Sequence, residues 1–262
     1  MQERYVGDTP DFGKYALLRA LAGKPQDIRI GVNWYLTHPL EVDSPKNNDG
    51  EKRHHRSQRA RFQPIDADLW GKLEDFQHQD DRCLKTFEKS QILPPDTVFW
   101  SQPLSYNGLR TTQEKVDFRK RWVADAQAHL SRCDLIFLDP DNGLAGEVAR
   151  HKKQGPKWVF YDEIDGYLQR GQSVVIIQFM GRQKGGTLVF SDLVKRRLME
   201  RTAFKGDIQA TNFSGGKSII YYILPAQRHI DKISARLSSL ELPSKNPVFS
   251  QSKLRSRKPL SS

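Results

Sequence analysis

Short apolar runs alternate with amphipathic segments along this chain, and the alternation limits the folds that it can adopt. Apolar runs of this length predict strands, and apolar residues that recur every three to four positions predict helices. Their alternation is typical of a mainly parallel sheet covered by helices on both faces. We expect strands at 28–36, 96–102, 134–139 and 172–179, helices at 13–22, 69–76, 81–93, 111–133 and 191–202, and a short strand followed by a helix within 158–171.

The last strands depart from this alternation. Residues 207–213 and 217–225 are strand-like runs separated by Ser214-Gly215-Gly216, which predicts an antiparallel hairpin. We therefore predict an α/β fold: a three-layer sandwich with a mainly parallel sheet and a C-terminal antiparallel hairpin. At the starts of the first and last helices, Asp11 and Ser191 are placed to act as N-caps.

The expected organisation is one domain with a tail. The domain spans residues 1–242 and contains a polar insertion at about 37–64, where apolar residues are few. Residues 243–262 include five Lys or Arg residues and no acid, among several Pro and Ser residues. This composition predicts disorder, because it offers too little apolar surface to bury.

The chain is basic, with 42 Lys and Arg against 31 Asp and Glu and a formal net charge of +11. Such a charge favours a polyanionic partner, and nucleic acid, either RNA or DNA, is the first candidate. A basic protein without such a partner is the alternative. The N-terminal residues lack the apolar core of a signal peptide and no apolar run is long enough to span a membrane, so we expect a cytoplasmic protein.

The segment 134–144, DLIFLDPDNGL, is the strongest candidate for a functional site. An apolar run ends there in a turn with two carboxylates and an amide, those of Asp139, Asp141 and Asn142. In open α/β sheets, ligands bind outside the carboxyl ends of the strands, where this turn is expected to lie. The alternative is an ordinary turn, because Asp, Asn and Gly are common wherever a chain reverses.

A second segment, YVGDTPDFGKY at 5–15, runs directly into the first expected helix. It resembles the opening HAGNxADVLKH segment of bacterial 23S ribosomal-RNA adenine-N6 methyltransferases. Gly7, Asp11 and Lys14 match that pattern, and Asp8 stands where the family has Asn. In the family this segment helps to build the cofactor and target pocket. The resemblance therefore implies that Asp8, Asp11 and Lys14 line a pocket for S-adenosylmethionine.

Asp139-Pro140 matches the start of the (D/N)PP(Y/F/W) tetrapeptide of amino-methyltransferases. By that resemblance, Asp139 accepts a hydrogen bond from a substrate amine, and Asp141 and Asn142 orient the amine. The predicted sandwich with its closing hairpin is also the general form of class I S-adenosylmethionine-dependent methyltransferases. The chain is similar, too, to a set of uncharacterised bacterial and phage proteins that carry GDxxDFGKYxLLR and LDPDNGL.

Two features depart from the methyltransferase pattern. Asp141 and Asn142 replace the second proline and the aromatic residue that would stack on a base. A ring from Trp158, Phe160 or Tyr161 is an alternative, although such residues are more commonly part of a core. Residues 30–39, IGVNWYLTHP, lack the glycine-rich loop that these enzymes place after their first strand.

Two other functions fit the same residues. Asp139 and Asp141 form a DxD pair at a strand end, which suits Mg²⁺, so a Mg-dependent nuclease or phosphohydrolase is one alternative. The other is a non-catalytic nucleic-acid-binding module that uses the basic run at 52–61 and the basic tail. No histidine pair has the spacing typical of metal ligands, and His54-His55 is expected at the surface.

Overall fold

The structure is a computed structural model that describes every residue except 44–53, 78–82, 181–185, 217, 242–246 and 252–262. Its centre is a seven-stranded sheet in the order β2-β1-β3-β6-β8-β7-β9, beside a two-stranded ribbon of β4 and β5. The strands are β1 (Ile30–Asn33), β2 (Val98–Trp100), β3 (Leu135–Leu138), β4 (Gly143–Leu144), β5 (Trp158–Val159), β6 (Ser173–Phe179), β7 (Gln209–Phe213), β8 (Ile219–Leu224) and β9 (Phe249–Gln251).

The strand directions confirm the predicted mixed sheet. Strands β2, β1, β3 and β6 run parallel to one another. Strand β8 runs antiparallel to both of its neighbours, β6 and β7. The predicted hairpin is therefore present, and its second strand lies inside the sheet with the first strand beyond it.

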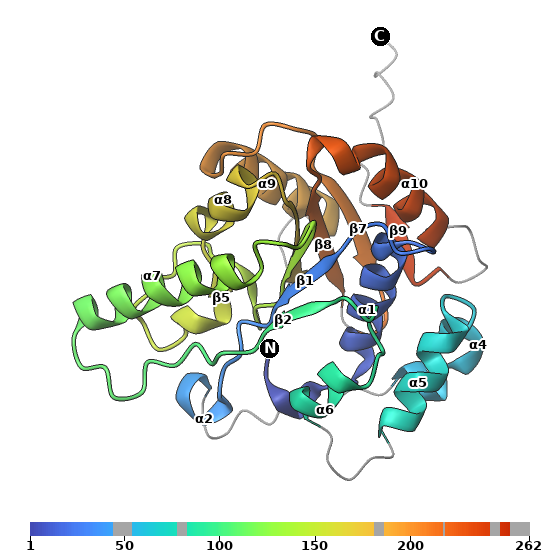
Figure 1. Cartoon of the computed structure of the whole chain (residues 1–262), viewed down its shortest axis with the longest axis horizontal. Helices are drawn as coiled ribbons and strands as arrows, with labels where there is room; N and C mark the ends of the chain where they lie inside the picture. Colours follow the sequence, from blue (N-terminus) through green and yellow to red (C-terminus); the bar gives the residue numbers. More distant parts are fainter. Residues whose placement is uncertain (44–53, 78–82, 181–185, 217, 242–246, 252–262) are drawn as a thin grey trace.

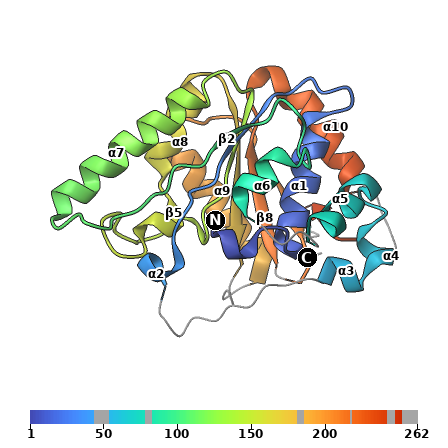
Figure 2. The same cartoon turned by 60° about the horizontal axis from the view of Figure 1, so that its bottom comes forward.

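Helices cover both faces of the sheet (Figures 1 and 2). One face carries α1 (Thr9–Ala22), α5 (Ala67–Gln77), α6 (Leu84–Lys89) and α10 (Ile230–Leu240), and the other carries α7 (Thr112–His129), α8 (Tyr161–Gln169) and α9 (Gly186–Arg201). Shorter helices are α2 (Pro39–Val42), α3 (His54–Ser57), α4 (Arg59–Phe62), η1 (Glu3–Tyr5), η2 (Gly155–Lys157) and η3 (Gln227–His229). The expected three layers are thus present.

Side chains of the central strands alternate between two apolar cores, one on each face of the sheet. Phe137 and Val175 belong to the core that includes α1, whereas Ile136 and Ile176 belong to the core that includes α7 and α8. Every residue of β3 is buried for this reason. A strand covered on both faces has an unbroken apolar sequence, which explains why residues 135–138 stand out.

Two predicted helix starts are wrong. Helix α1 begins at Thr9 and is capped by Asp8, whose carboxylate accepts a hydrogen bond from the Asp11 main-chain N–H at 3.1 Å. Pro10 is the second helical residue, where a missing N–H costs no hydrogen bond within the helix, and the cap lies one turn before the predicted Asp11. Helix α9 begins at Gly186, so Ser191 lies within the helix and does not cap it.

The polar segments are more ordered than their composition predicts. Phe249–Gln251, in the tail expected to be disordered, form β9, because the Phe249 ring packs on Phe213 of β7. The tail beyond residue 251 lies outside the described residues. His55, expected at the surface, is buried, since its ring stacks on Phe12 and bonds to the Thr9 hydroxyl at 3.1 Å. Within the described ranges, no helix has the length and apolar character needed to cross a membrane.

Candidate functional site

The two segments singled out in the sequence meet at the carboxyl ends of β1 and β3. The Lys14 ammonium on α1 lies 2.8 Å from a carboxylate oxygen of Asp139, which follows β3 directly. The same ammonium lies 2.8 Å from Asp11 Oδ1, one turn earlier on α1. Capping by Asp8 fixes the first turn of the helix and so sets the direction of both side chains. Residues separated by more than a hundred positions thereby form one ion-pair cluster.

This cluster is closed to water. Asp11, Lys14 and Asp139 are 0%, 3% and 1% exposed. The second oxygen of Asp11 accepts hydrogen bonds from the Gly7 main-chain N–H at 2.9 Å and from the Tyr15 hydroxyl at 2.8 Å. We call Asp8, Asp11, Lys14, Tyr15 and Asp139 the buried network; the charged atoms of Asp11, Lys14 and Asp139 are directed at one another.

Burial and ion pairing together shift the pKa values of the buried network. Burial opposes the charge on Lys14, but Asp11 and Asp139 outweigh this effect and raise the pKa of the ammonium. Burial raises the pKa of Asp139, and the nearby Asp11 charge adds to it, whereas Lys14 and the Met1 ammonium act in the opposite direction. Burial is therefore the main reason why the pKa of Asp139 is raised, and the charge of Asp11 adds to it.

Asp141, two residues later, has different surroundings. Its carboxylate lies 3.0 Å from the Met1 ammonium and accepts hydrogen bonds from Gln2 Nε2 at 2.9 Å and from the Thr37 hydroxyl at 3.1 Å. Burial would raise the pKa of Asp141, but the Met1 ammonium and Lys157 outweigh it and lower the pKa. Asp141 is thus an ionised carboxylate that binds the N-terminal segment to the turn.

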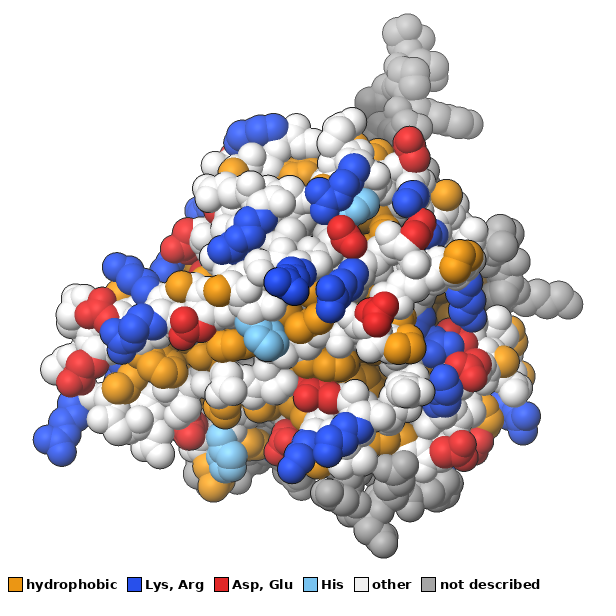
Figure 3. Space-filling view, viewed as in Figure 1, with side chains coloured by type: hydrophobic (Ala, Val, Ile, Leu, Met, Phe, Trp, Pro, Cys, Tyr) orange, Lys and Arg blue, Asp and Glu red, His pale blue; other side chains and the backbone are white. Residues whose placement is uncertain are grey.

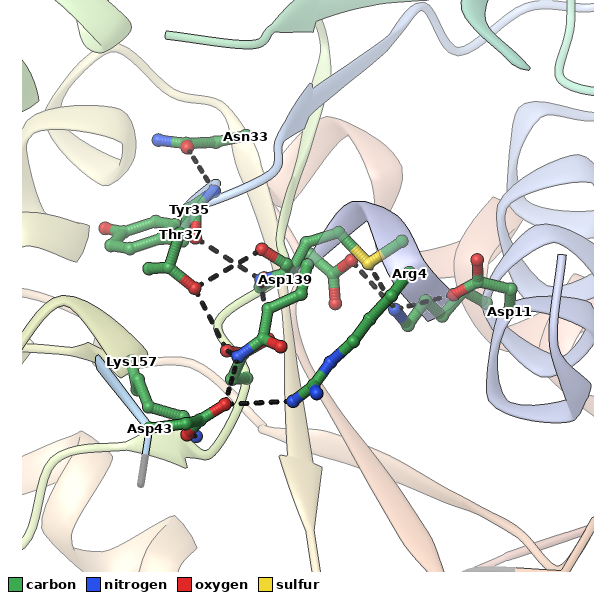
Figure 4. A network of polar contacts seen from close by, with 12 residues as sticks. Arg4, Asp11, Asn33, Tyr35, Thr37, Asp43, Asp139 and Lys157 are labelled. Carbon is green, nitrogen blue, oxygen red and sulfur yellow. Dashed lines mark hydrogen bonds and ion pairs between the residues drawn. The ribbon is translucent and has the colours of Figure 1, made fainter. Parts of the chain in front are cut away.

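Asp43 extends this set of contacts towards the loop before β5 (Figure 4). It lies 2.6 Å from the Lys157 ammonium and 3.0 Å from the Arg4 guanidinium, and it accepts a hydrogen bond from Gln2 Nε2 at 2.7 Å. Gln2 therefore bridges Asp43 and Asp141. The contacts join the N-terminal segment, the residues after β1, the Asp139–Asn142 turn and η2.

The turn itself is held by Gln178 of β6. Its amide nitrogen donates to the Asn142 carbonyl at 3.1 Å, and its amide oxygen accepts from the Leu144 main-chain N–H at 2.9 Å. Gly143, between them, has a φ of +112°, and a Cβ there would lie 2.5 Å from the Gln178 oxygen. Both the backbone angle and the close approach require glycine at this position.

On the far side of the turn, a cleft of about 780 Å³ opens between β4, β5, the end of β6 and α9. Partly exposed rings of Trp158, Phe179 and Phe190 line it, together with Tyr161. Asn142 also lines the cleft, as does Arg197 of α9. Its volume lies within the range of small-molecule sites.

The structure thus divides the six predicted site residues among three environments. Asp8, Asp11, Lys14 and Asp139 form the buried network, Asp141 lies beside it, and Asn142 faces the cleft. The predicted rings are divided too: Trp158 and Tyr161 line the cleft, whereas Phe160 is buried between the guanidinium groups of Arg119 and Arg150, each 4.6 Å from its centre.

The acidic residues at the start of α8 form ion pairs of their own. Glu163 pairs with Arg119 at 2.5 Å, and Asp162 pairs with Arg150 at 2.8 Å. Among the residues described, no three His, Cys, Asp or Glu side chains are arranged to hold a metal ion. Asp139 and Asp141 direct their carboxylates to different cations, so the DxD pair does not form a preassembled Mg²⁺ site.

The fit of S-adenosylmethionine differs between the buried network and the cleft. Asp8, Asp11 and Lys14 are buried and bond to one another. After β1, the chain continues into the buried side chains of Trp34 and Tyr35. Space of the right size is present in the cleft, where aromatic rings and a guanidinium group match an adenine ring and a carboxylate.

Sequence reasoning missed Gln178, Asp43 and Lys157. A polar side chain within the β-branched run 173–179 was a signal for Gln178, because a buried amide needs hydrogen-bond partners. Asp43 and Lys157 lie in polar segments among many other charged residues, and no local pattern distinguishes them.

The basic residues form no single patch on the face shown in Figure 3, where Lys and Arg are interspersed with Asp and Glu. Lys52 and Arg53 of the predicted basic run lie outside the described residues. In the remainder of the run, Arg59 stacks on Trp70 at 4.8 Å, and Arg61 donates to the Ser214 carbonyl at 3.0 Å. These arginines therefore have structural contacts as well as charge.

Comparison of the chain with protein-family profiles, with curated proteins and with solved structures finds no match.

Proposed function

We propose that this protein is a methyltransferase that transfers a methyl group from S-adenosylmethionine to an amine of a nucleic acid. The observation that carries the proposal is the ion pair of Lys14 and Asp139 at 2.8 Å. It joins the two segments that resemble methyltransferase motifs, residues 5–15 and 134–144. The mixed sheet with its antiparallel β8 is consistent with the form of class I enzymes.

The proposal gives the buried network a positioning role. Lys14 holds Asp139, and Gln178 holds the Asn142 carbonyl, so the turn between them is fixed at the edge of the cleft. The Asn142 side chain lines that cleft and would accept a hydrogen bond from the substrate amine. This assigns to Asn142 the accepting role that the motif resemblance gives to Asp139.

S-Adenosylmethionine, when bound, supplies an electrophilic methyl group. The substrate amine would receive that methyl group and would lose one proton to bulk solvent as the product leaves the cleft. The part of this chain is to hold the amine and exclude water, with the rings of Trp158 and Phe179 as apolar walls.

The first test is equilibrium dialysis of the protein with labelled S-adenosylmethionine, followed by transfer assays on RNA and DNA. We expect saturable binding and label incorporated into one class of nucleic acid. No binding at millimolar cofactor would contradict the proposal. Mg²⁺-dependent degradation of the same substrates, in the absence of the cofactor, would favour the nuclease alternative.

A variant test separates Asn142 from the fold. We expect Asn142→Ala to retain cofactor binding and to lower transfer by roughly 10–100-fold, the effect of one lost polar contact to the reacting group. Asn107→Ala, at an exposed position away from the cleft, is the matched control and should leave transfer unchanged. Equal transfer by the two variants would remove Asn142 from the reaction.

A further inference from the structure

The cleft combines flat apolar walls with one positive charge. Trp158 and Tyr161 come from β5 and the start of α8, and Phe179 and Phe190 come from the end of β6 and from α9. Tyr161 is buried, but the rings of Trp158, Phe179 and Phe190 stay partly exposed, and such rings in a concave surface bury their apolar faces only when a ligand covers them. A planar ligand would gain most from such walls.

Arg197 supplies the charge. Among the described residues that line the cleft there is no Asp or Glu. Among the described residues, no ion pair joins Arg197 to an acidic side chain. Burial raises the pKa of Tyr161, whereas the charges of Arg197 and Arg201 lower it, so both guanidinium groups lie within electrostatic reach of that ring. The cleft therefore presents a cation beside an aromatic wall.

The polar edge of the cleft is rigid. Gln178 uses its amide nitrogen on the carbonyls of Asn142 and Phe179 and its oxygen on the Leu144 N–H. With Gln178 committed to the turn, the polar side chains of the described wall that can contact a ligand include Asn142, Arg197 and Ser218, and Arg197 is the charged one. They offer an amide for hydrogen bonding and a guanidinium group for an anion.

We propose that the cleft binds an aromatic base carrying an anionic group, with the base against the partly exposed Trp158 ring and the anion at Arg197. Two sources have this chemistry: the adenosyl group and carboxylate of the methyl donor, and a nucleotide of the substrate with its phosphate. The inference rests on the proposed function for the identity of these sources. The binding itself is measured without methyl transfer.

The test is titration calorimetry of the full chain with adenosine, AMP, S-adenosylmethionine and a short single-stranded oligoadenylate. We compare Arg197→Gln with Arg196→Gln, which removes an exposed arginine from the adjacent position of α9. Arg197→Gln is expected to lower the affinity for the anionic ligands by roughly tenfold or more, because the charge-assisted contact is lost. The affinity for adenosine should not change. Arg197→Lys should restore part of the affinity.

Trp158→Leu tests the stacking contact independently of the charge. It should lower the affinities for adenosine and for the anionic ligands by the same factor, roughly tenfold, because all of them contain the stacked base. Binding of S-adenosylmethionine that depends on Arg197 identifies the cofactor as the occupant. Binding of AMP or oligoadenylate that depends on Arg197 identifies a nucleotide, even if no methyl transfer is found.

The inference is overturned if none of the four ligands binds saturably, or if Arg197→Gln and Arg196→Gln bind the anionic ligands equally. Urea denaturation of each variant shows whether the fold is retained. If AMP binding depends on Arg197 but no methyl transfer is found, the proposed reaction is rejected and the binding site is retained. The two proposals can therefore fail separately.

Discussion

The buried network and the cleft lie on opposite sides of the Asp139–Asn142 turn. They differ in whether their polar side chains are buried or accessible. In the buried network, Lys14, Asp11 and Asp139 are excluded from water and bond to one another. In the cleft, Asn142 and Arg197 are accessible to a ligand. Charges that satisfy one another stabilise a geometry, whereas accessible polar groups can recognise something else. The residues that fix the turn are therefore distinct from the residues beside it that can contact a ligand.

The largest effect should come from removing the cation of the buried network. Lys14→Met leaves Asp11 and Asp139 buried without their common partner, and we expect a loss of roughly 3–5 kcal/mol in the free energy of unfolding. Urea denaturation measures it, with Lys120→Met on the exposed side of α7 as the control. A loss below about 1 kcal/mol would show that water reaches the buried network.

Asp141→Asn should have a smaller effect that depends on pH. The pKa of Asp141 is lowered in the folded protein, so its carboxylate stabilises the fold above the unfolded-state pKa and loses this contribution as pH falls through the folded pKa. We expect a loss of roughly 2 kcal/mol at pH 7 and a smaller loss near pH 3, below the usual pKa of an aspartate. The measurement is urea denaturation at both pH values, with exposed Asp125→Asn as the control. An equal loss at both would mean that shape, not charge, matters at this position.

Gly143→Ala tests the join between the two regions. The positive φ and the contact with Gln178 both resist a Cβ, and we expect a loss of roughly 1–2 kcal/mol in the free energy of unfolding. Gly146→Ala, where a Cβ meets nothing within 4 Å, is the control in the same loop. If the two variants are equally stable in urea denaturation, the turn is adaptable and cannot hold Asn142 in place.

The smallest effect on stability should come from the cleft. Trp158→Leu removes a partly exposed ring, and we expect it to lower the free energy of unfolding by less than about 1 kcal/mol. Trp34→Leu, in the core beside Phe87 and Phe99, should cost roughly 3 kcal/mol in the same thermal or urea measurement. Comparable losses would mean that the cleft wall is part of the core rather than a binding surface.

The fold was predictable because its elements have strong local patterns. The apolar runs at 135–138 and 173–179 are buried on both faces, and the hairpin strands are separated by a Ser-Gly-Gly turn, so each carries its own signal. Helix starts were less predictable, since Asp8 and Asp11 are both acceptable caps by type. Only the course of the backbone decides between them.

The position of the turn at 139–142 was predictable from the sequence, but the ion pairs around it were not. Strand-end geometry predicted that the turn at 139–142 would lie at the edge of the sheet, and the motif at 5–15 predicted that Lys14 would lie near it. No sequence pattern showed that Lys14 and Asp139 neutralise each other, or that Asp43 pairs with Lys157 over more than a hundred residues. Such pairs depend on tertiary packing.

The position of β8 has a consequence for the order in which the chain can fold. Strand β8 lies between β6 and β7 and bonds to both, although it follows both in the sequence. During synthesis, β6 and β7 therefore present unpaired edges until residues 219–224 have left the ribosome. The IIYYIL run of β8, buried at every position, has its place only inside the sheet. Completion of the sheet is thus a late event, and the time before it is when the nascent chain is most exposed to aggregation.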